Sequence, residues 1–162
     1  MGYTHYFTFK KTKTVAEAWA LEKKYQRAIR ACQKLIYNYA QNNGGLSGYN
    51  AHSKPGAYGG ISVNGSRENG HEDFVLAKTL AENYQSDFWG FCKTAQKPYD
   101  IVVVACLIIL KHYLGEYIDV NSDGDAPDWV PGLMLAMHET GLKRLKIPSS
   151  IRRVGKTVTI AV

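Results

Sequence analysis

Residues 93–128 read KTAQKPYDIVVVACLIILKHYLGEYIDVNSDGDAPD and contain the longest apolar run of the chain, Ile101–Leu110. This run is too short to cross a membrane, which takes about 20 apolar residues. Its β-branched residues would suit a buried strand. However, Asp100 before it is a good N-cap, and Gly115 after it is a good residue to end a helix. The sequence therefore predicts a nearly all-apolar central helix over Ile101–Leu114, buried in the core.

The segments around this run predict two further helices and several strands. Thr14 and Glu17 have the spacing of a capping box, and apolar residues recur every three or four positions from there to about Gln41. Another helix should begin after Asp125 and end at Gly141. Alternating, aromatic or β-branched composition marks the candidate strands, which are Tyr3–Lys10, Ile61–Val63, Asp73–Ala77, Asp87–Thr94 and Glu116–Val120.

This order of elements predicts one α+β domain over residues 1–162. A mainly antiparallel sheet should pack against about three helices, one of them the nearly all-apolar central helix. A glycine-rich segment at about 43–60 is expected to be a long loop, and such loops are often functional. Residues at about 143–162 form a basic tail, and its last part, Thr157–Val162, could be an edge strand or a docked extension.

The composition is that of an ordinary globular protein, with 45% hydrophobic and 21% charged residues in a chain of 162. The first residues lack the basic and apolar regions of a secretion signal. The cysteines, Cys32, Cys92 and Cys106, do not suggest a disulfide framework and are expected to be buried, inert thiols in a reducing cytoplasm. We therefore expect a cytoplasmic protein without membrane attachment and without a cofactor. The sequence is compatible with a homo-oligomer.

The net charge of +6 is unevenly distributed along the chain. One face of the predicted helix after Thr14 carries a row of cations without alternating acids, which we call the basic stripe: Lys23, Arg27, Arg30 and Lys34. Such a row is usually the solvated face of an amphipathic helix, but it can also contact the phosphates of a polyanion. We retain the basic stripe as a surface for an anionic partner, with weak nucleic-acid binding as one alternative.

The junction between the predicted strand Asp87–Thr94 and the central helix holds concentrated polar chemistry. Lys93 and Thr94 close the strand, whereas Tyr99 and Asp100 open the helix. A helix N-terminus attracts anions, a lysine and a hydroxyl add to that attraction, and a tyrosine ring can stack on a base. Two carboxylates would face the hydroxyl or amine groups of such a ligand if the fold brings them in. The predicted ligand site therefore consists of Glu72, Lys93, Thr94, Tyr99, Asp100 and Asp123.

Metal binding is the main chemical alternative, at the acidic run after the central helix. Asp119 and Asp123 have the spacing of ligands in a calcium loop, but Val130 replaces the glutamate of its twelfth position. We therefore expect a turn followed by a helix, and no tight calcium binding. A metal-dependent phosphodiesterase that uses Asp123, Asp125 and Glu72 is retained as an alternative.

Several short segments resemble a group of small uncharacterised phage and prophage proteins. They are Met1–Tyr6, Glu72–Phe74, Phe91–Asp100 and Ser122–Gly124 with Trp129. The string Lys-Thr-x-x-Lys-Pro-Tyr-Asp at residues 93–100 is the most specific of them. The resemblance implies a host-cell cytoplasm and favours a counter-defence protein, since many such proteins bind and sequester nucleotide signals. It implies no catalytic activity.

We therefore expect a non-enzymatic binding protein for a small phosphorylated ligand of the nucleotide type. The basic surface, the aromatic content and the Lys/Thr/Tyr junction support this expectation, because aromatic rings stack on bases and cations hold phosphates. The alternatives are the metal-dependent phosphodiesterase, a nucleic-acid-binding protein that uses the basic stripe and basic tail, and a protein inhibitor of a host enzyme.

Overall fold

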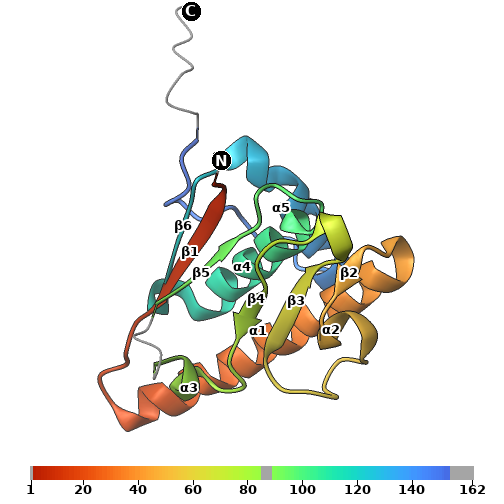
Figure 1. The fold of residues 1–162 in the computed structure, drawn as a ribbon. Helices are drawn as coiled ribbons and strands as arrows, with labels where there is room; N and C mark the ends of the chain where they lie inside the picture. The colour runs from red at the N-terminus through yellow and green to blue at the C-terminus, as the bar shows by residue number, and fades with distance from the viewer. Residues whose placement is uncertain (1, 85–88, 154–162) are drawn as a thin grey trace, which may run out of the picture.

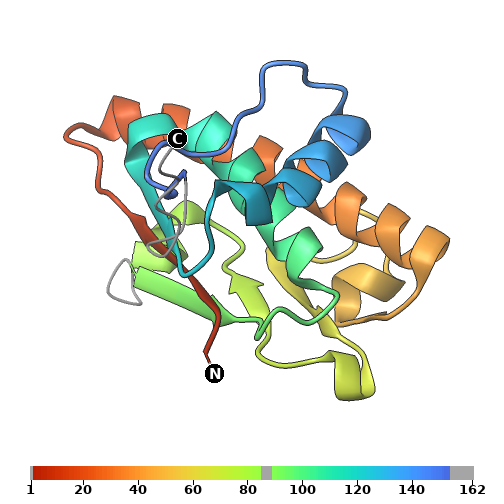
Figure 2. The same ribbon diagram turned by 90° about the horizontal axis from the view of Figure 1, so that it is seen from above.

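The computed structural model describes residues 2–84 and 89–153, which form a mixed α/β fold (Figures 1 and 2). Within these residues there are five α-helices and two three-stranded antiparallel sheets. The helices are α1 (Val15–Asn43), α2 (Tyr49–His52), α3 (Leu80–Tyr84), α4 (Asp100–Leu114) and α5 (Ala126–Thr140). The strands are β1 (Thr4–Phe9), β2 (Leu46–Ser47), β3 (Ile61–Gly65), β4 (Phe74–Leu76), β5 (Trp89–Lys93) and β6 (Ile118–Ser122).

The first sheet has the strand order β5-β1-β6, with β1 in the middle and antiparallel to both neighbours. Phe7 and Phe9 of β1 are buried in the core, whereas the alternating residues Tyr6 and Thr8 are half-buried on the other face. This alternation follows from the period of two residues in a strand. It confirms the predicted strand Tyr3–Lys10.

The second sheet has the order β2-β3-β4 and is not paired with the first in the described residues. The predicted strands Ile61–Val63 and Asp73–Ala77 correspond to β3 and β4, which pair with each other. Antiparallel pairing is thus confirmed, but the prediction of a single sheet was wrong. The edges of β4 and β5 face a cavity between the two sheets instead of forming a ladder.

The prediction of one long loop at about residues 43–60 was wrong. This glycine-rich segment contains β2 and α2 (Figure 1). Leu46 and Ala51 of this segment are buried, and Asn50 Oδ1 accepts a hydrogen bond of 2.6 Å from the Ser62 N–H of β3. These contacts fix the segment against the second sheet. The closely spaced glycines of this segment are typical of loops, so the sequence did not predict the short strand β2 or the short helix α2.

Helix α1 begins at its predicted cap, where Thr14 Oγ1 accepts a hydrogen bond of 3.1 Å from the Glu17 N–H. It continues to Asn43, slightly beyond the predicted end near Gln41, and Gly44 ends it with a φ of 69°. The predicted apolar face is the one that packs on the core. Its fully buried members include Leu21, Tyr25, Ala28, Cys32 and Leu35.

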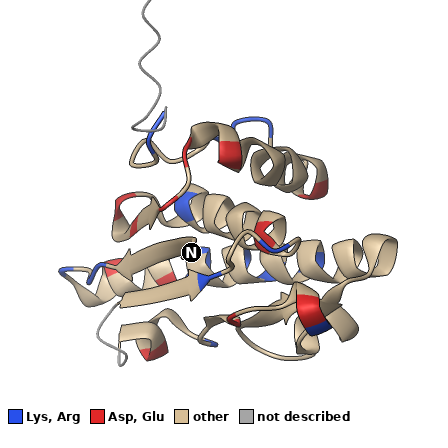
Figure 3. Ribbon diagram, turned by 45° about the horizontal axis from the view of Figure 1, so that its top comes forward, with Lys and Arg blue, Asp and Glu red and all other residues tan. Residues whose placement is uncertain are grey.

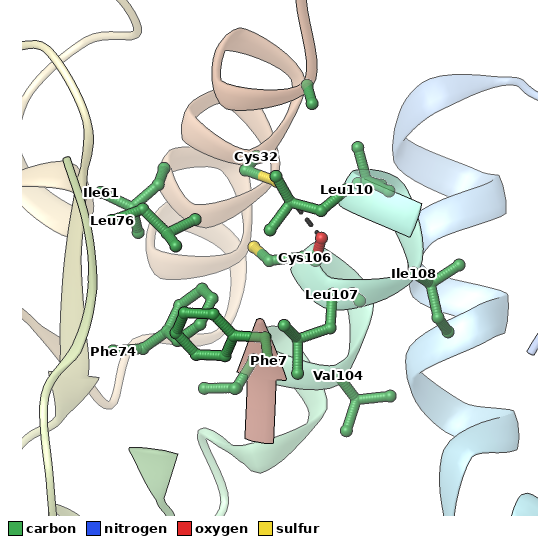
Figure 4. Packing of buried hydrophobic residues seen from close by; sticks show 14 of the residues in the cluster. Phe7, Cys32, Ile61, Phe74, Leu76, Val104, Cys106, Leu107, Ile108 and Leu110 are labelled. Atoms are coloured by element: carbon green, nitrogen blue, oxygen red, sulfur yellow. Dashed lines mark hydrogen bonds between the residues drawn. The ribbon is translucent and has the colours of Figure 1, made fainter. Parts of the chain in front are cut away.

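Helix α4 packs between α1 and α5, and Figure 4 shows its side chains meeting residues from both sheets. Leu107 of α4 lies near Phe7 of β1 and Phe74 of β4, so α4 packs against residues of both sheets in one hydrophobic core. The Cys32 thiol of α1 donates a hydrogen bond of 3.7 Å to the Cys106 carbonyl oxygen of α4. Burial raises the pKa of Cys32 well above its ordinary value, which keeps this thiol protonated.

The estimate of about three helices was too low, because α2 and α3 have only four and five residues and cannot show a helical period. Among the described helices, none combines the length and the apolar composition that a membrane crossing requires. The predicted extension Thr157–Val162 and the end of the basic tail lie outside the described residues.

Candidate functional site

Most of the predicted ligand residues meet at one end of the β5-β1-β6 sheet. Figure 1 shows these three strands side by side. Because β1 is antiparallel to both neighbours, its first residues lie beside the ends of β5 and β6. Thr4 is opposite Lys93, and the Thr4 N–H donates a hydrogen bond of 3.0 Å to Asp123 Oδ2 just after β6. Lys93 and Asp123, which are distant in sequence, therefore flank the same short segment of β1.

A buried chain of hydrogen bonds connects four segments at this end of the sheet. His5 of β1 is fully buried, and its Nδ1 lies 2.8 Å from Ser122 Oγ of β6. Its Nε2 lies 2.6 Å from Asp100 Oδ1, in the first turn of α4. The Thr94 hydroxyl donates a hydrogen bond of 2.5 Å to the same oxygen. We call these four residues the His5 network, and it holds two strands, a helix and the β5–α4 loop together.

Aromatic rings and a glycine enclose the His5 network. The His5 ring packs edge-on against Tyr3 and Trp129, with ring centroids 5.3 and 5.4 Å away. Ser122 Oγ accepts hydrogen bonds of 3.2 Å from Trp129 Nε1 and of 2.9 Å from the Gly124 N–H. A Cβ atom on Gly124 would lie 2.1 Å from the Tyr3 hydroxyl oxygen, so a glycine is required for this packing.

Ser122, His5 and Asp100 are the residue types of a hydrolase triad, but their surroundings indicate a structural role. Two N–H groups already donate to Ser122 Oγ and occupy the lone pairs that a nucleophile needs. His5 has no exposed surface through which a substrate could approach. The His5 network therefore orders this end of the sheet.

The loop from β5 to α4 has an uncommon backbone conformation. Ala95 and Gln96 have φ values of 52° and 56°, a region that residues with a Cβ seldom adopt. The N–H groups of Thr94 and Ala95 both donate to the Tyr3 carbonyl oxygen, at 3.1 and 3.2 Å, and the Lys97 N–H donates to the Thr94 carbonyl at 3.0 Å. Such strain persists only where the surroundings enforce it, and it is concentrated at functional sites.

Glu72 fixes Lys93 from the side opposite β1. Glu72 Oε2 accepts a hydrogen bond of 2.8 Å from the Lys93 N–H, and the Glu72 N–H donates one of 3.2 Å to the Lys93 carbonyl. The Tyr99 hydroxyl and the Cys92 thiol both donate to the Glu72 carbonyl, at 2.6 and 3.5 Å. Burial raises the pKa of Cys92 to about 12, so this thiol is not a reactive thiolate at neutral pH.

This arrangement contradicts three predictions, two about contacts with a ligand and one about a helix cap. Tyr99 is 1% exposed, so the prediction that its ring stacks on a base was wrong. Thr94 is fully buried, and its hydroxyl is engaged with Asp100 instead of a ligand. The prediction of Asp100 as N-cap was also wrong, because Asp100 lies inside the first turn of α4 and its carboxylate contacts His5.

The remaining predicted residues reach the surface at two separate places. At the sheet end, Lys93 and Glu72 are half-buried and Asp123 is exposed. The basic stripe lies elsewhere, with all of its members exposed along α1, whose charged residues Figure 3 marks. The sheet end and the basic stripe are therefore two distinct candidate surfaces.

The carboxylates proposed for a metal-dependent phosphodiesterase have separate partners. Asp125 Oδ1 is paired with Arg152 Nε at 3.1 Å, Asp123 accepts from the Thr4 backbone, and Glu72 accepts from the Lys93 backbone. In residues 2–84 and 89–153, no group of three or more His, Cys, Asp or Glu side chains is placed to hold a metal ion. The calcium-loop spacing falls on β6, whose strand conformation does not wrap around an ion.

Sequence reasoning missed His5, Ser122 and Trp129 as parts of this site. A signal was present, because His5 falls on the apolar side of its strand together with Tyr3 and Phe7. A buried imidazole needs hydrogen-bond partners. The identity of those partners depended on β6 and α4, which lie more than ninety positions away, as the separations of 117 and 95 residues show.

No family model, no curated protein and no solved structure matches this chain.

Proposed function

We propose that the end of the β5-β1-β6 sheet binds a small phosphorylated ligand of the nucleotide type and holds it without cleaving it. The observation that supports this most directly is the position of Lys93. Its backbone is fixed on both sides, by Thr4 and by Glu72. Its side chain runs along Gly2, where a Cβ atom would lie 3.3 Å from Lys93 Cε.

The Lys93 ammonium has no carboxylate at ion-pair distance in the described part of the chain. A cation that is not neutralised and extends from a fixed backbone favours an anionic ligand, because a phosphate gains charge-assisted hydrogen bonds without displacing an existing carboxylate. Lys97 follows the strained loop and adds a second, half-buried lysine to the β5–α4 junction. The exposed carboxylate of Asp123 offers an acceptor for ligand hydroxyl or amine groups.

Binding without cleavage is supported by the state of the nearby nucleophiles. The Ser122 hydroxyl is saturated by N–H donors, and the Cys92 thiol is buried with its pKa raised to about 12. Together with the resemblance to phage proteins, this supports sequestration of a host nucleotide signal, which is a counter-defence role in the host-cell cytoplasm.

The test is a thermal-shift screen of the full chain against mono-, di- and cyclic nucleotides. A ligand that binds only the folded state raises the melting temperature, and we expect at least one nucleotide to do so. Lys93→Ala should remove the shift, and Lys93→Arg should retain part of it. Lys143→Ala, at an exposed lysine of the basic tail, is the matched control and should leave the shift unchanged.

Chromatography of the released ligand separates holding from cleavage. Recovery of the intact nucleotide supports sequestration, whereas a cleaved product would favour the phosphodiesterase alternative. If no nucleotide shifts the melting temperature, or if Lys93→Ala leaves a shift intact, the proposal fails.

A second candidate function, nucleic-acid binding, is favoured by the exposed residues at the start of the basic stripe. Val15 and Trp19 of α1 are 75% and 71% exposed and share an open surface of this helix with Lys23 and Arg27. Aromatic rings beside cations suit single-stranded nucleic acid, because bases stack and phosphates pair. In the described residues none of the stripe cations has an ion-pair partner.

Fluorescence anisotropy with a labelled single-stranded oligonucleotide tests this candidate. We expect weak binding that falls steeply with salt, with a log–log slope of about −0.7 for each phosphate contact. Arg27→Glu combined with Arg30→Glu should abolish it, while Lys93→Ala should not affect it. Binding that does not change with salt or with these charge reversals would rule out the stripe as the contact surface.

A further inference from the structure

Strand β5 presents two exposed aromatic rings in line with Lys93. Trp89, Phe91 and Lys93 are alternate residues of the strand and therefore share one face of the sheet. Trp89 is 51% exposed and Phe91 47% exposed, and their ring centroids are 5.0 Å apart. The core does not require these rings, since Cys92 and Phe7 fill the other face.

The same two rings border a cavity of about 220 Å³ between β5 and β4. Phe7 and Phe9, both buried, also line this cavity, as does Val75 of β4, which is 55% exposed. Asp73 is the acidic residue of the lining; its Oδ1 accepts a hydrogen bond of 2.8 Å from Asn64 Nδ2. The lining of the cavity is therefore mixed, with aromatic and aliphatic side chains beside the polar side chains of Asp73 and Asn83.

The shape of this cavity limits what can enter it. Sites for whole drug-sized ligands usually measure about 300–1,000 Å³, so this one is suited to a single planar ring. An inserted peptide strand is disfavoured, because the hydrogen bond of 3.2 Å from the Glu72 N–H to the Lys93 carbonyl closes the gap between the two edges at one end. Lys93 is the β5 residue at that closed end, and its side chain lies along Gly2.

We infer that this cavity is the base-binding part of the proposed ligand site, with the ring of a nucleotide against Phe91 and Trp89 and its phosphate on Lys93. This inference rests on the proposed function. Phe91 and Lys93 are two residues apart, about 7 Å along a strand, so one nucleotide can reach both. The Asp73 carboxylate can accept a hydrogen bond from a ring N–H or an exocyclic amine. Phe91 thus takes the stacking role that the sequence had assigned to Tyr99.

Calorimetry with two kinds of probe tests the inference. The four ribonucleoside monophosphates carry a base and a phosphate, whereas ribose 5-phosphate carries only the phosphate. We expect the unmodified protein to bind at least one monophosphate more tightly than ribose 5-phosphate. Phe91→Ala should weaken that monophosphate about tenfold or more, which is the usual effect of removing a stacking ring, and should leave ribose 5-phosphate unchanged.

Two further variants make the outcome unambiguous. Phe91→Tyr retains a ring and should retain the affinity, and Lys93→Ala should weaken both probes. Phe91 is half exposed, so its loss should not unfold the chain, and circular dichroism of each variant verifies this. If Phe91→Ala weakens both probes equally or neither probe, this inference is overturned while the phosphate site stands. If neither probe binds the unmodified protein, the proposed function itself fails.

Discussion

His5 shows how a single polar residue can determine the arrangement around it. It lies on the apolar face of β1, so its two ring nitrogens had to find partners inside the protein. Those partners are Ser122 on β6 and Asp100 on α4. An imidazole at this position therefore specifies which strand and which helix lie next to β1, in addition to packing against Trp129.

Replacing Asp100 tests whether it belongs to the His5 network. Asp100→Ala leaves the His5 ring and the Thr94 hydroxyl without their acceptor, and buried unsatisfied groups cost about 1–3 kcal/mol. We expect the free energy of unfolding to fall by about 2–3 kcal/mol in urea titrations. A helix cap alone would cost only about 1 kcal/mol.

The double variant Asp100→Ala with Thr94→Val distinguishes the two roles. Within one network the two losses should not add, because the first substitution already removes the shared hydrogen bond. Additive losses would mean that Asp100 acts independently of Thr94. Glu17→Ala at the exposed cap of α1 is the control: it removes the hydrogen bond from the Lys13 N–H to Glu17 Oε2 and should cost less than about 1 kcal/mol.

Buried Cys92 makes the stability of the fold depend on pH in the alkaline range. Its pKa rises from an ordinary value of 9.0 to about 12 in the folded protein, because burial disfavours the thiolate. Above pH 9 the unfolded chain loses this proton while the folded chain keeps it, so the free energy of unfolding should decrease between pH 9 and 12. Tyr25 adds to the decrease, since burial raises its pKa as well.

Urea titrations at several pH values from about 8 upward measure this effect. The decrease should be smaller in Cys92→Ala, which removes one of the titrating groups. In the native protein the thiol should react with a thiol reagent only as fast as the chain opens. Rapid reaction of Cys92 under native conditions, or stability that is constant above pH 9, would contradict the prediction.

At the scale of elements, the contact between α4 and α5 depends on Gly132. Gly132 lies inside α5, where a glycine normally costs about 0.5–1 kcal/mol relative to alanine. Here, however, a Cβ atom would lie 2.4 Å from Val104 Cγ1 and 3.1 Å from the Ala105 nitrogen of α4. Gly132→Ala should therefore destabilise the protein by about 1–3 kcal/mol, the usual cost of overpacking.

Thermal unfolding of three variants checks this contact. Adding Val104→Ala should recover part of the loss caused by Gly132→Ala, because it removes the obstructing methyl groups. Met134→Ala, at a position 65% exposed on the same helix, should be nearly neutral. A stabilising Gly132→Ala would show that α5 can move away from α4 at little cost.

The sequence predicted those elements whose own residues carry the full signal. Helix α1 has a long apolar period and a capping box, so both its face and its start were correct. Helices α2 and α3 are about one turn long, and what stabilises them lies outside them: Asn50 bonds to Ser62, and the Leu80 N–H donates to Glu22. Such short elements cannot be predicted from periodicity.

At the scale of the whole molecule, the site depends on contacts that no local pattern contains. Lys93, Glu72 and Asp123 were named from their local motifs, and the fold does bring them to one end of a sheet. The burial of Tyr99 could not be predicted, because it results from the packing of α4 against residues around Glu72. Whether a residue of the β5–α4 junction is buried or exposed therefore depends on contacts with residues that are distant in sequence.

The central place of β1 has a consequence for the order of folding. β1 is synthesised well before β5 and β6, and its pairing with β6 joins residues 117 positions apart. During synthesis, α1 and the β3–β4 hairpin can form early, because their contacts join residues that are close in sequence. The aromatic strand β1 (HYFTF) can pair only after β5 and β6 have been synthesised. During that interval it is an open strand that other chains can pair with, so slow elongation or high expression should favour aggregation through β1. Strand β1 is therefore synthesised before both of its partner strands and completes its pairing only after β6 has been made.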